Sequence, residues 1–248
     1  VLNVQSLWEK TKGKGVKIAI IDDGINLQHP DLQHITPSFS YDAEQRKLSS
    51  SPLSNIDRHG TMVAGIIFAA HNGFGIDGIA PEAELIALRQ PDTWTSNTLL
   101  SFQLAKLAGA DIVNCSWHSR WLLQPVADIV NELAATGRGG KGLPIVFSAG
   151  NENRLVEKNM TESAIMSAIV VGAGDGGKRR LGYSNYGPSV DLYIYATPVM
   201  STGRDGGYQR FSGTSLAAAI TSGYVALLLA QNSELTLGQV VAKLRNRK

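Results

Sequence analysis

Short runs of β-branched and other apolar residues alternate along this chain with longer stretches of helical periodicity. The short runs predict buried strands, and their separation by helix patterns predicts a parallel sheet. The predicted fold is therefore α/β, with three layers: a mainly parallel central sheet and helices on both of its faces. The predicted strands are residues 16–21, 84–89, 111–117, 144–148, 168–172 and 191–195, and the predicted helices are 2–12, 62–70, 97–110, 122–136, 216–230 and 237–244.

The longest apolar stretch, residues 211–230, begins with small and hydroxyl-bearing residues. Gly213 permits a tight turn, Thr214 is suited to cap a helix, and Ser215 falls where the helix would start. A serine there presents its hydroxyl at the positive end of the helix dipole. Read alone, the stretch predicts a buried core helix with a hydroxyl cap.

Composition narrows the class of protein. With 248 residues and no internal repeat, we expect one domain over residues 1–248. The sequence begins Val-Leu-Asn, so we expect a trimmed chain from which the signal peptide, the propeptide and any C-terminal domain are absent. A net charge of +2 without a basic stripe argues against a nucleic-acid partner. Polar residues interrupt the longest apolar run at 221–223, so we expect no membrane span. The single cysteine, Cys115, excludes an intramolecular disulfide.

Polar groups stand at three of the predicted strand ends and helix starts. Asp22 follows the first strand, His59 precedes the helix at 62–70, and Ser215 begins the helix at 216–230. Serine is a weak nucleophile that needs a neighbouring base, and histidine fills that role when a carboxylate fixes its tautomer. The segment 73–78 matches the glycine spacing of dinucleotide-binding loops, but it follows a helix and opens none, so we reject it.

The order Asp, His, Ser is that of the subtilisin triad. Segments 20–25, 59–65 and 213–217 resemble the three signature blocks of the subtilisin-like serine proteases, or subtilases. A fourth block, 148–151, resembles the family's oxyanion block, which assigns the oxyanion-binding amide to Asn151. Together the blocks cover residues 16–230 and imply a serine endopeptidase that acts on polypeptides through an Asp22–His59–Ser215 triad.

Within the family, segments 22–24 and 114–117 resemble the kexin/furin-like branch most closely. That resemblance places Asp23 at the S2 subsite, favouring a basic P2 residue; the alternative is a solvated turn carboxylate. It also implies that Ser116, Trp117 and His118 line the substrate groove, with His118 where a glycine is usual. The acidic residues that hold a P1 arginine in kexins are absent after Trp117, and Glu152 is the one acid placed to reach the S1 rim.

A second departure concerns Ala219, since subtilases usually have proline four residues after the catalytic serine. An alanine there prompts the alternative of a peptide ligase or transpeptidase, in which an amine resolves the acyl-enzyme. A further alternative is a non-catalytic, peptide-binding relative whose groove His118 partly fills.

The resemblance also implies a structural Ca²⁺ ion, because subtilases commonly bind one near the His-Pro-Asp-Leu block. Asp31 and Asn72 match the side-chain ligands, with carbonyls near Phe74 and Ile76; the alternative is that Asp31 caps a turn and no ion binds. As for other members, we expect a monomer, inhibition by its own propeptide or a proteinaceous inhibitor, and a secreted, periplasmic or otherwise extracytoplasmic location.

Overall fold

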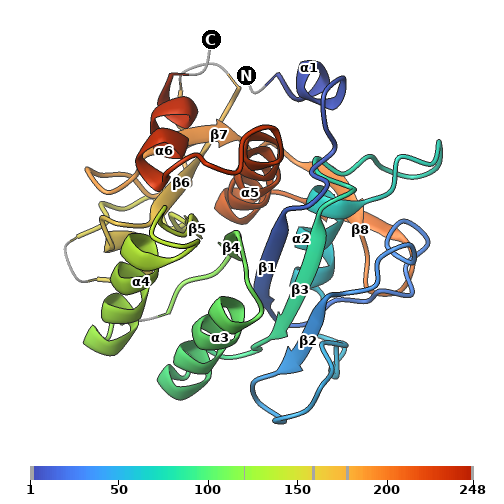
Figure 1. Cartoon of the computed structure of the whole chain (residues 1–248), viewed down its shortest axis with the longest axis horizontal. Helices are drawn as coiled ribbons and strands as arrows, with labels where there is room; N and C mark the ends of the chain where they lie inside the picture. The colour runs from blue at the N-terminus through green and yellow to red at the C-terminus, as the bar shows by residue number, and fades with distance from the viewer. Residues whose placement is uncertain (1–2, 120, 158–159, 177–178, 247–248) are drawn as a thin grey trace.

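The computed structural model describes residues 3–119, 121–157, 160–176 and 179–246. Within these residues, seven strands form one sheet in the order β2-β3-β1-β4-β5-β6-β7, and every neighbouring pair is parallel (Figure 1). This confirms the predicted α/β fold. The strands are β1 (Lys17–Asp22), β2 (Phe39–Asp42), β3 (Glu84–Arg89), β4 (Ile112–Cys115), β5 (Ile145–Ser148), β6 (Ile169–Gly174) and β7 (Leu192–Tyr195), and β8 (Val199–Thr202) pairs with β9 (Tyr208–Phe211) in a separate antiparallel hairpin.

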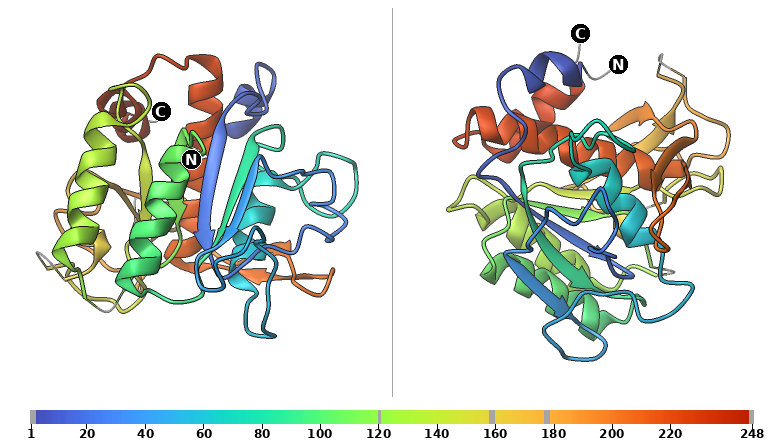
Figure 2. Two further views of the ribbon diagram at one scale, coloured as in Figure 1. Left: turned by 60° about the horizontal axis from the view of Figure 1, so that its bottom comes forward. Right: turned by 90° about the vertical axis from the view of Figure 1, so that its right-hand side faces the viewer.

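Helices cover both faces of the sheet. They are α1 (Val4–Trp8), α2 (His59–Phe68), α3 (Thr95–Leu107), α4 (Gln124–Thr136), α5 (Gly213–Gln231) and α6 (Leu237–Arg245), with a short 3₁₀ helix, η1 (Glu162–Ala164). Figure 2 shows α3 and α4 side by side on one face, with α5 on the other. The predicted helix 2–12 is shorter than expected, and its first residue lies outside the described part of the chain.

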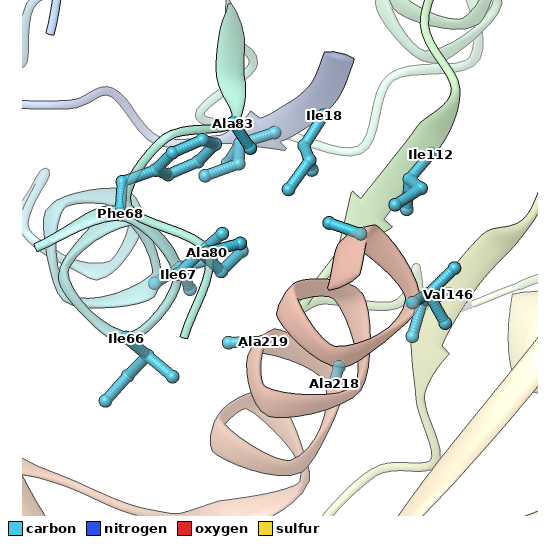
Figure 3. Packing of buried hydrophobic residues seen from close by; sticks show 14 of the residues in the cluster. Ile18, Ile66, Ile67, Phe68, Ala80, Ala83, Ile112, Val146, Ala218 and Ala219 are labelled. Atoms are coloured by element: carbon cyan, nitrogen blue, oxygen red, sulfur yellow. The ribbon is translucent and has the colours of Figure 1, made fainter. Parts of the chain in front are cut away.

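Strand β1 shows how the sequence separates the two layers. Ile18 and Ile20 belong to the core cluster that includes α2 and α5, whereas Ala19 and Ile21 belong to the cluster that includes α3 and α4. Successive side chains of a strand point to opposite faces, so an uninterrupted apolar run fits a strand buried on both sides. In Figure 3, Phe68 of α2 and Ala218 and Ala219 of α5 lie in the layer that also holds Ile18 and Val146.

Helix α5 crosses the middle of that layer. By length and composition it could cross a membrane, with a mean hydropathy of 1.5, contrary to the expectation that no run is long and apolar enough. However, 72% of the 18-residue window is buried inside the protein, where the helix contacts β4, β5 and β6. The apolar sequence is therefore that of a core helix.

Three strands were not predicted. The polar stretch 38–55 lacks an uninterrupted apolar run, but its first part forms edge strand β2, where Phe39 and Tyr41 stack with ring centroids 6.3 Å apart. Strands β8 and β9 also gave no recognised signal. Their hairpin is fixed to α2 by hydroxyl groups: Ser201 Oγ donates to Met62 O at 2.6 Å, and Thr202 Oγ1 donates to Thr61 O at 2.7 Å.

Candidate active site

Asp22 and His59 meet at the carboxyl edge of the sheet. Asp22 is the last residue of β1 and is 4% exposed; His59 is the first residue of α2. His59 Nδ1 lies 2.9 Å from Asp22 Oδ1 and 3.0 Å from Oδ2. Burial opposes protonation of the ring, but the charge and hydrogen bond of Asp22, with the charge of Asp23, outweigh it and raise the pKa of His59. The carboxylate thus directs Nε2 outward and stabilises the imidazolium.

The carboxylate of Asp23 holds the first turn of α2. Its oxygens accept hydrogen bonds from the backbone N–H groups of Arg58 at 3.0 Å, His59 at 2.9 Å and Gly60 at 2.7 Å. Helix starts leave such N–H groups without partners, and a carboxylate there is also favoured by the helix dipole. Burial, then the charge of Asp22, raise the pKa of Asp23 to about 6, although the amides of Gly60 and His59 oppose the rise. The predicted contact of Asp23 with a P2 residue stays a prediction, while the structure gives its oxygens a capping role.

Ser215 lies in the first turn of α5, and residue 212 occupies the N-cap position without a side-chain capping bond. The expectation that Thr214 caps the helix is therefore wrong. The hydroxyl of Ser215 donates to the carbonyl of Ser116 at 2.8 Å, and Ser116 Oγ donates back to Ser215 O at 3.1 Å. Four residues earlier, Phe211 meets the His59 ring edge-on at 5.5 Å, so the start of α5 and the start of α2 lie at one place.

Thr214 orients Asn151 instead. Its N–H and its hydroxyl both donate to Asn151 Oδ1, at 2.9 and 3.1 Å, and the same hydroxyl accepts from Gly150 N at 3.2 Å. Because these donors occupy Oδ1, the Nδ2 group of Asn151 is left to donate elsewhere, an orientation assigned from the hydrogen-bond network. Asn151 thus enters the site as a hydrogen-bond donor.

The residues predicted to line a groove lie on both sides of Ser215. Trp117 packs edge-on against Phe147 with centroids 6.0 Å apart, and its indole N–H donates to Ile21 O at 2.6 Å. His118 Nε2 lies 3.5 Å from Glu152 Oε1, which joins the segment after β4 to the segment after β5.

Sequence reasoning missed Glu162, which is 1% exposed in η1. Its carboxylate accepts Ser119 N at 2.8 Å and Ser119 Oγ at 2.6 Å, and the next residue, Ser163, donates to Ser148 O at 2.8 Å. Through its hydrogen bonds to Ser119, Glu162 therefore holds the segment after β4 in place. A lone glutamate in a loop carries no periodic signal that would have identified it.

The residues expected to bind calcium come together only in part. Asp31 is fully buried; its Oδ2 accepts Ile76 N at 3.0 Å and Tyr208 Oη at 2.9 Å, while Oδ1 has no partner among the described residues. Asn72 Oδ1 accepts Phe74 N at 2.9 Å. The described residues contain no group of three His, Cys, Asp or Glu side chains able to hold a metal. Ca²⁺ requires six to eight oxygen ligands. Asp31 Oδ1 is thus a buried carboxylate oxygen that remains open to a cation, whereas Asp31 Oδ2 and Asn72 Oδ1 already accept backbone amides.

Comparisons with known proteins identify the family of the chain. The model of the subtilase family (Peptidase_S8) matches residues 13–248. A thermophilic serine proteinase from Bacillus sp. (strain AK1) is 33% identical over 234 residues, which is 90% of this chain and 55% of that protein. A calcium-dependent protease from Trichormus variabilis (strain ATCC 29413 / PCC 7937) is 30% identical, over 96% of this chain and 42% of that protein.

A solved structure shares the fold. A cold adapted subtilisin-like serine proteinase superposes with a TM-score of 0.79 at 26% identity, covering 96% of this chain and 84% of the other. Subtilisin E from Bacillus subtilis (strain 168) is 28% identical over 94% of this chain and 60% of its own length. The chain thus spans about half the length of these three curated relatives, from 42% to 60%.

Proposed function

The chain belongs to the subtilase family, and we propose that it is a serine endopeptidase in which Ser215 is the nucleophile, His59 the base and Asp22 the acid that orients it. One observation carries the proposal: the buried Asp22 carboxylate holds His59 Nδ1 at 2.9 Å at the edge of the sheet where α5 presents Ser215. This leaves His59 Nε2 as the nitrogen that takes a proton.

The reaction begins when the Ser215 hydroxyl turns from the carbonyl of Ser116 towards His59. His59 removes its proton as Oγ attacks the peptide carbonyl, and the imidazolium then donates that proton to the leaving amine. Water hydrolyses the acyl-enzyme by the same route in reverse. The raised pKa of His59 suits both steps, since Asp22 stabilises the cation that forms between them.

Two donors serve the developing oxyanion. Thr214 fixes the oxygen end of the Asn151 amide, so its Nδ2 donates. The N–H of Ser215 belongs to the first turn of α5, where backbone donors have no partner within the helix. In subtilisin, the loss of the equivalent asparagine lowers kcat by about 10²–10³-fold. Donors fixed before the reaction need no reorganisation as the charge develops.

The test is hydrolysis of an unfolded protein substrate by the purified chain. We expect peptide products with the wild type and none with Ser215→Ala or His59→Ala, whereas Ser212→Ala, on the same turn, retains activity. Equal activity in wild type and Ser215→Ala would overturn the proposal. A folded chain that binds peptides but never cleaves them would support the non-catalytic alternative.

The kexin-like motifs carry a finer proposal, a preference for basic residues near the cleavage site. Glu152 supports it, because its carboxylate directly follows Asn151 in the chain and is 40% exposed. Asp23 supports it less, because three amides already occupy its oxygens. A peptide library whose cleavage profile is the same for wild type, Asp23→Ala and Glu152→Gln would remove the preference.

Peptide ligation is the second candidate, and Ala219 motivates it. This residue is fully buried in α5, four residues after Ser215. Unlike a proline at that position, Ala219 keeps its backbone N–H and does not fix φ. With an added amine nucleophile, ligation predicts aminolysis products, and Ala219→Pro should shift them towards hydrolysis. Hydrolysis products alone would rule ligation out.

Calcium, the inhibitory partner, the single-domain organisation and the location remain proposals from the family. The calcium-dependent relative and the open Asp31 Oδ1 support an ion, whereas Asp31 Oδ2 already accepts hydrogen bonds from Ile76 and Tyr208. A thermal midpoint that EGTA does not lower would exclude a stabilising ion. The family also favours an extracytoplasmic enzyme that acts on polypeptides and is held inactive by a propeptide or a proteinaceous inhibitor.

A further inference from the structure

The side chains of His118 and Glu152 pair near Ser215. His118 lies two residues after Ser116, whose carbonyl accepts the Ser215 hydroxyl at 2.8 Å. Glu152 directly follows Asn151, whose Oδ1 accepts a hydrogen bond from Thr214 N. The distance of 3.5 Å between His118 Nε2 and Glu152 Oε1 therefore closes a bridge between the two segments that flank the reacting serine.

The contact between His118 and Glu152 depends on the protonation state of His118. Its Nδ1 lies 3.2 Å from Ser119 O, and its Nε2 faces the Glu152 carboxylate. Both ring nitrogens thus face acceptors, whereas a neutral imidazole donates from one nitrogen only. The geometry fits the imidazolium, and loss of one proton removes one of the two donors.

Glu152 is stabilised as a carboxylate by its neighbours. Burial opposes its charge, but hydrogen bonds from Asn185 and from the backbone of Asn151, with the charges of His118 and Arg154, lower the pKa of Glu152 overall. Asn185 Nδ2 donates to Oε2 at 2.6 Å, and Arg154 Nε lies 4.0 Å from the same oxygen. Oε1 is therefore the oxygen that faces His118.

Other charges lie near this bridge. Behind His118, the buried carboxylate of Glu162 is bound to Ser119. Across the site, burial raises the pKa of Asp23 to about 6, and the charge and hydrogen bond of Asp22 raise that of His59. A test of the bridge must cancel the titration of both groups.

From this geometry we propose that His118 and Glu152 form a proton-controlled selector for the charge of the P1 side chain, the residue whose carbonyl Ser215 attacks. Protonated His118 neutralises Glu152 and bridges the two segments. Neutral His118 releases Oε1, and the carboxylate then attracts a cationic P1 side chain. This inference rests on the proposed endopeptidase function and deepens it, because it makes the basic preference depend on pH.

The experiment compares two peptides that differ only at P1, one with arginine and one with citrulline, its neutral isostere. The ratio of their kcat/KM values, measured from pH 5 to 9, cancels the shared dependence on His59. For the wild type we expect the ratio to rise with pH by about 1.5- to fivefold, the range of a partly exposed ion pair.

Three variants show which residue causes the ratio to change with pH. His118→Asn, too short to reach Glu152, should give a high ratio that no longer changes with pH, and Glu152→Gln a low ratio that is equally flat. Arg154→Gln removes the other cation near Glu152 and should keep the pH-dependent rise. Asp23 still titrates in His118→Asn, so a rise that persists in that variant would assign the effect to Asp23 and overturn the proposal.

A flat ratio in the wild type would also overturn it. Failure of the selector is distinguishable from failure of the endopeptidase: in the first case citrulline peptides are cleaved with an unchanged ratio, and in the second neither peptide is cleaved. A chemical-shift titration of His118 in Ser215→Ala provides a readout without turnover. Its ring resonances at acid pH should shift in the additional variant Glu152→Gln, and unchanged resonances would contradict the pairing.

Discussion

Replacing Arg89 with methionine should destabilise this protein more than any loss of a surface ion pair. Arg89 ends β3 and is 3% exposed. Its guanidinium contacts Asp57 at 2.7 Å, Asp42 at 3.0 Å and Glu44 at 2.8 Å. Asp57 in turn accepts the amides of residues 53 and 54, at 3.0 and 3.1 Å, and lies two residues before His59. The arginine thus anchors the loop that leads into the candidate base.

The magnitude follows from what the substitution leaves behind. Asp42 and Asp57 are 2% and 4% exposed, so Arg89→Met strands two buried carboxylates, whereas Glu44, at 40%, returns to water. Removing one partner of a buried ion pair costs about 3–5 kcal/mol. Such a loss approaches the whole stability of a typical domain, about 5–15 kcal/mol. If Arg89→Met does not fold, Arg89→Lys keeps the charge but cannot contact all three carboxylates, and should cost less.

Lowering the pH should reduce the difference in unfolding free energy between the wild type and Arg89→Met. Burial raises the pKa of Asp57, but the hydrogen bond from Arg89, with those from the amides, lowers it overall. A carboxylate with a lowered pKa stabilises the wild type above its unfolded pKa, and this contribution is lost as the pH falls through the folded pKa. In Arg89→Met the same carboxylate is buried without a cation and favours the protonated form. The difference between the two proteins is therefore largest near pH 7.

Urea unfolding at pH 7 and pH 4.5 measures both effects, provided that the slope m is the same for the two proteins. Lys106→Met is the matched control, because it removes a pair with Glu132 whose partners are 44% and 42% exposed, and should cost about 0–1 kcal/mol. A deficit for Arg89→Met no larger than this control, or one that grows at acid pH, would refute the reasoning.

Three further predictions concern the site and its support. Asp23→Asn should move the acid limb of kcat/KM to lower pH, because it removes a negative charge that helps to raise the pKa of His59; a limb that stays in place or moves upward contradicts the assignment. Thr214→Val should lower kcat about five- to tenfold with little change in KM, since it removes one bond that orients Asn151, whereas Thr221→Val, whose hydroxyl bonds Ala217 O within α5, should leave kcat unchanged. Gly65→Ala should lower the free energy of unfolding by about 1–3 kcal/mol, because its Cβ would lie 2.7 Å from Ser201 Oγ and nearer still to Thr202; thermal unfolding at wild-type stability would show that the hairpin yields instead.

The sequence predicted the layers of the fold well, because buried parallel strands such as β1 and β5 are short uninterrupted apolar runs. It missed β2, since an edge strand with polar residues at alternate positions, Ser40 and Asp42, has no such run. Hairpin β8–β9 was missed because its contacts with α2 are made by hydroxyl groups rather than by an apolar face.

Some residues of the candidate site could likewise be recognised from the sequence, and others could not. Asp22, His59 and Ser215 are recognisable because each stands at a strand end or helix start within a distinctive block. The capping bonds of Asp23 and the support that Glu162 gives to Ser119 arise from residues far apart in the chain. Only the folded structure brings those partners together, so neither role has a local signal.

The central claim is that Ser215 is a nucleophile activated by His59, and reaction with a fluorophosphonate probe tests it most directly. Mass spectrometry should place one adduct on Ser215 in the wild type and none in Ser215→Ala, while Ser212→Ala still reacts. Labelling of His59→Ala should be slower by orders of magnitude, since the serine then lacks its base. A wild-type chain that remains unlabelled while correctly folded, or labelling that persists in Ser215→Ala, would contradict the account.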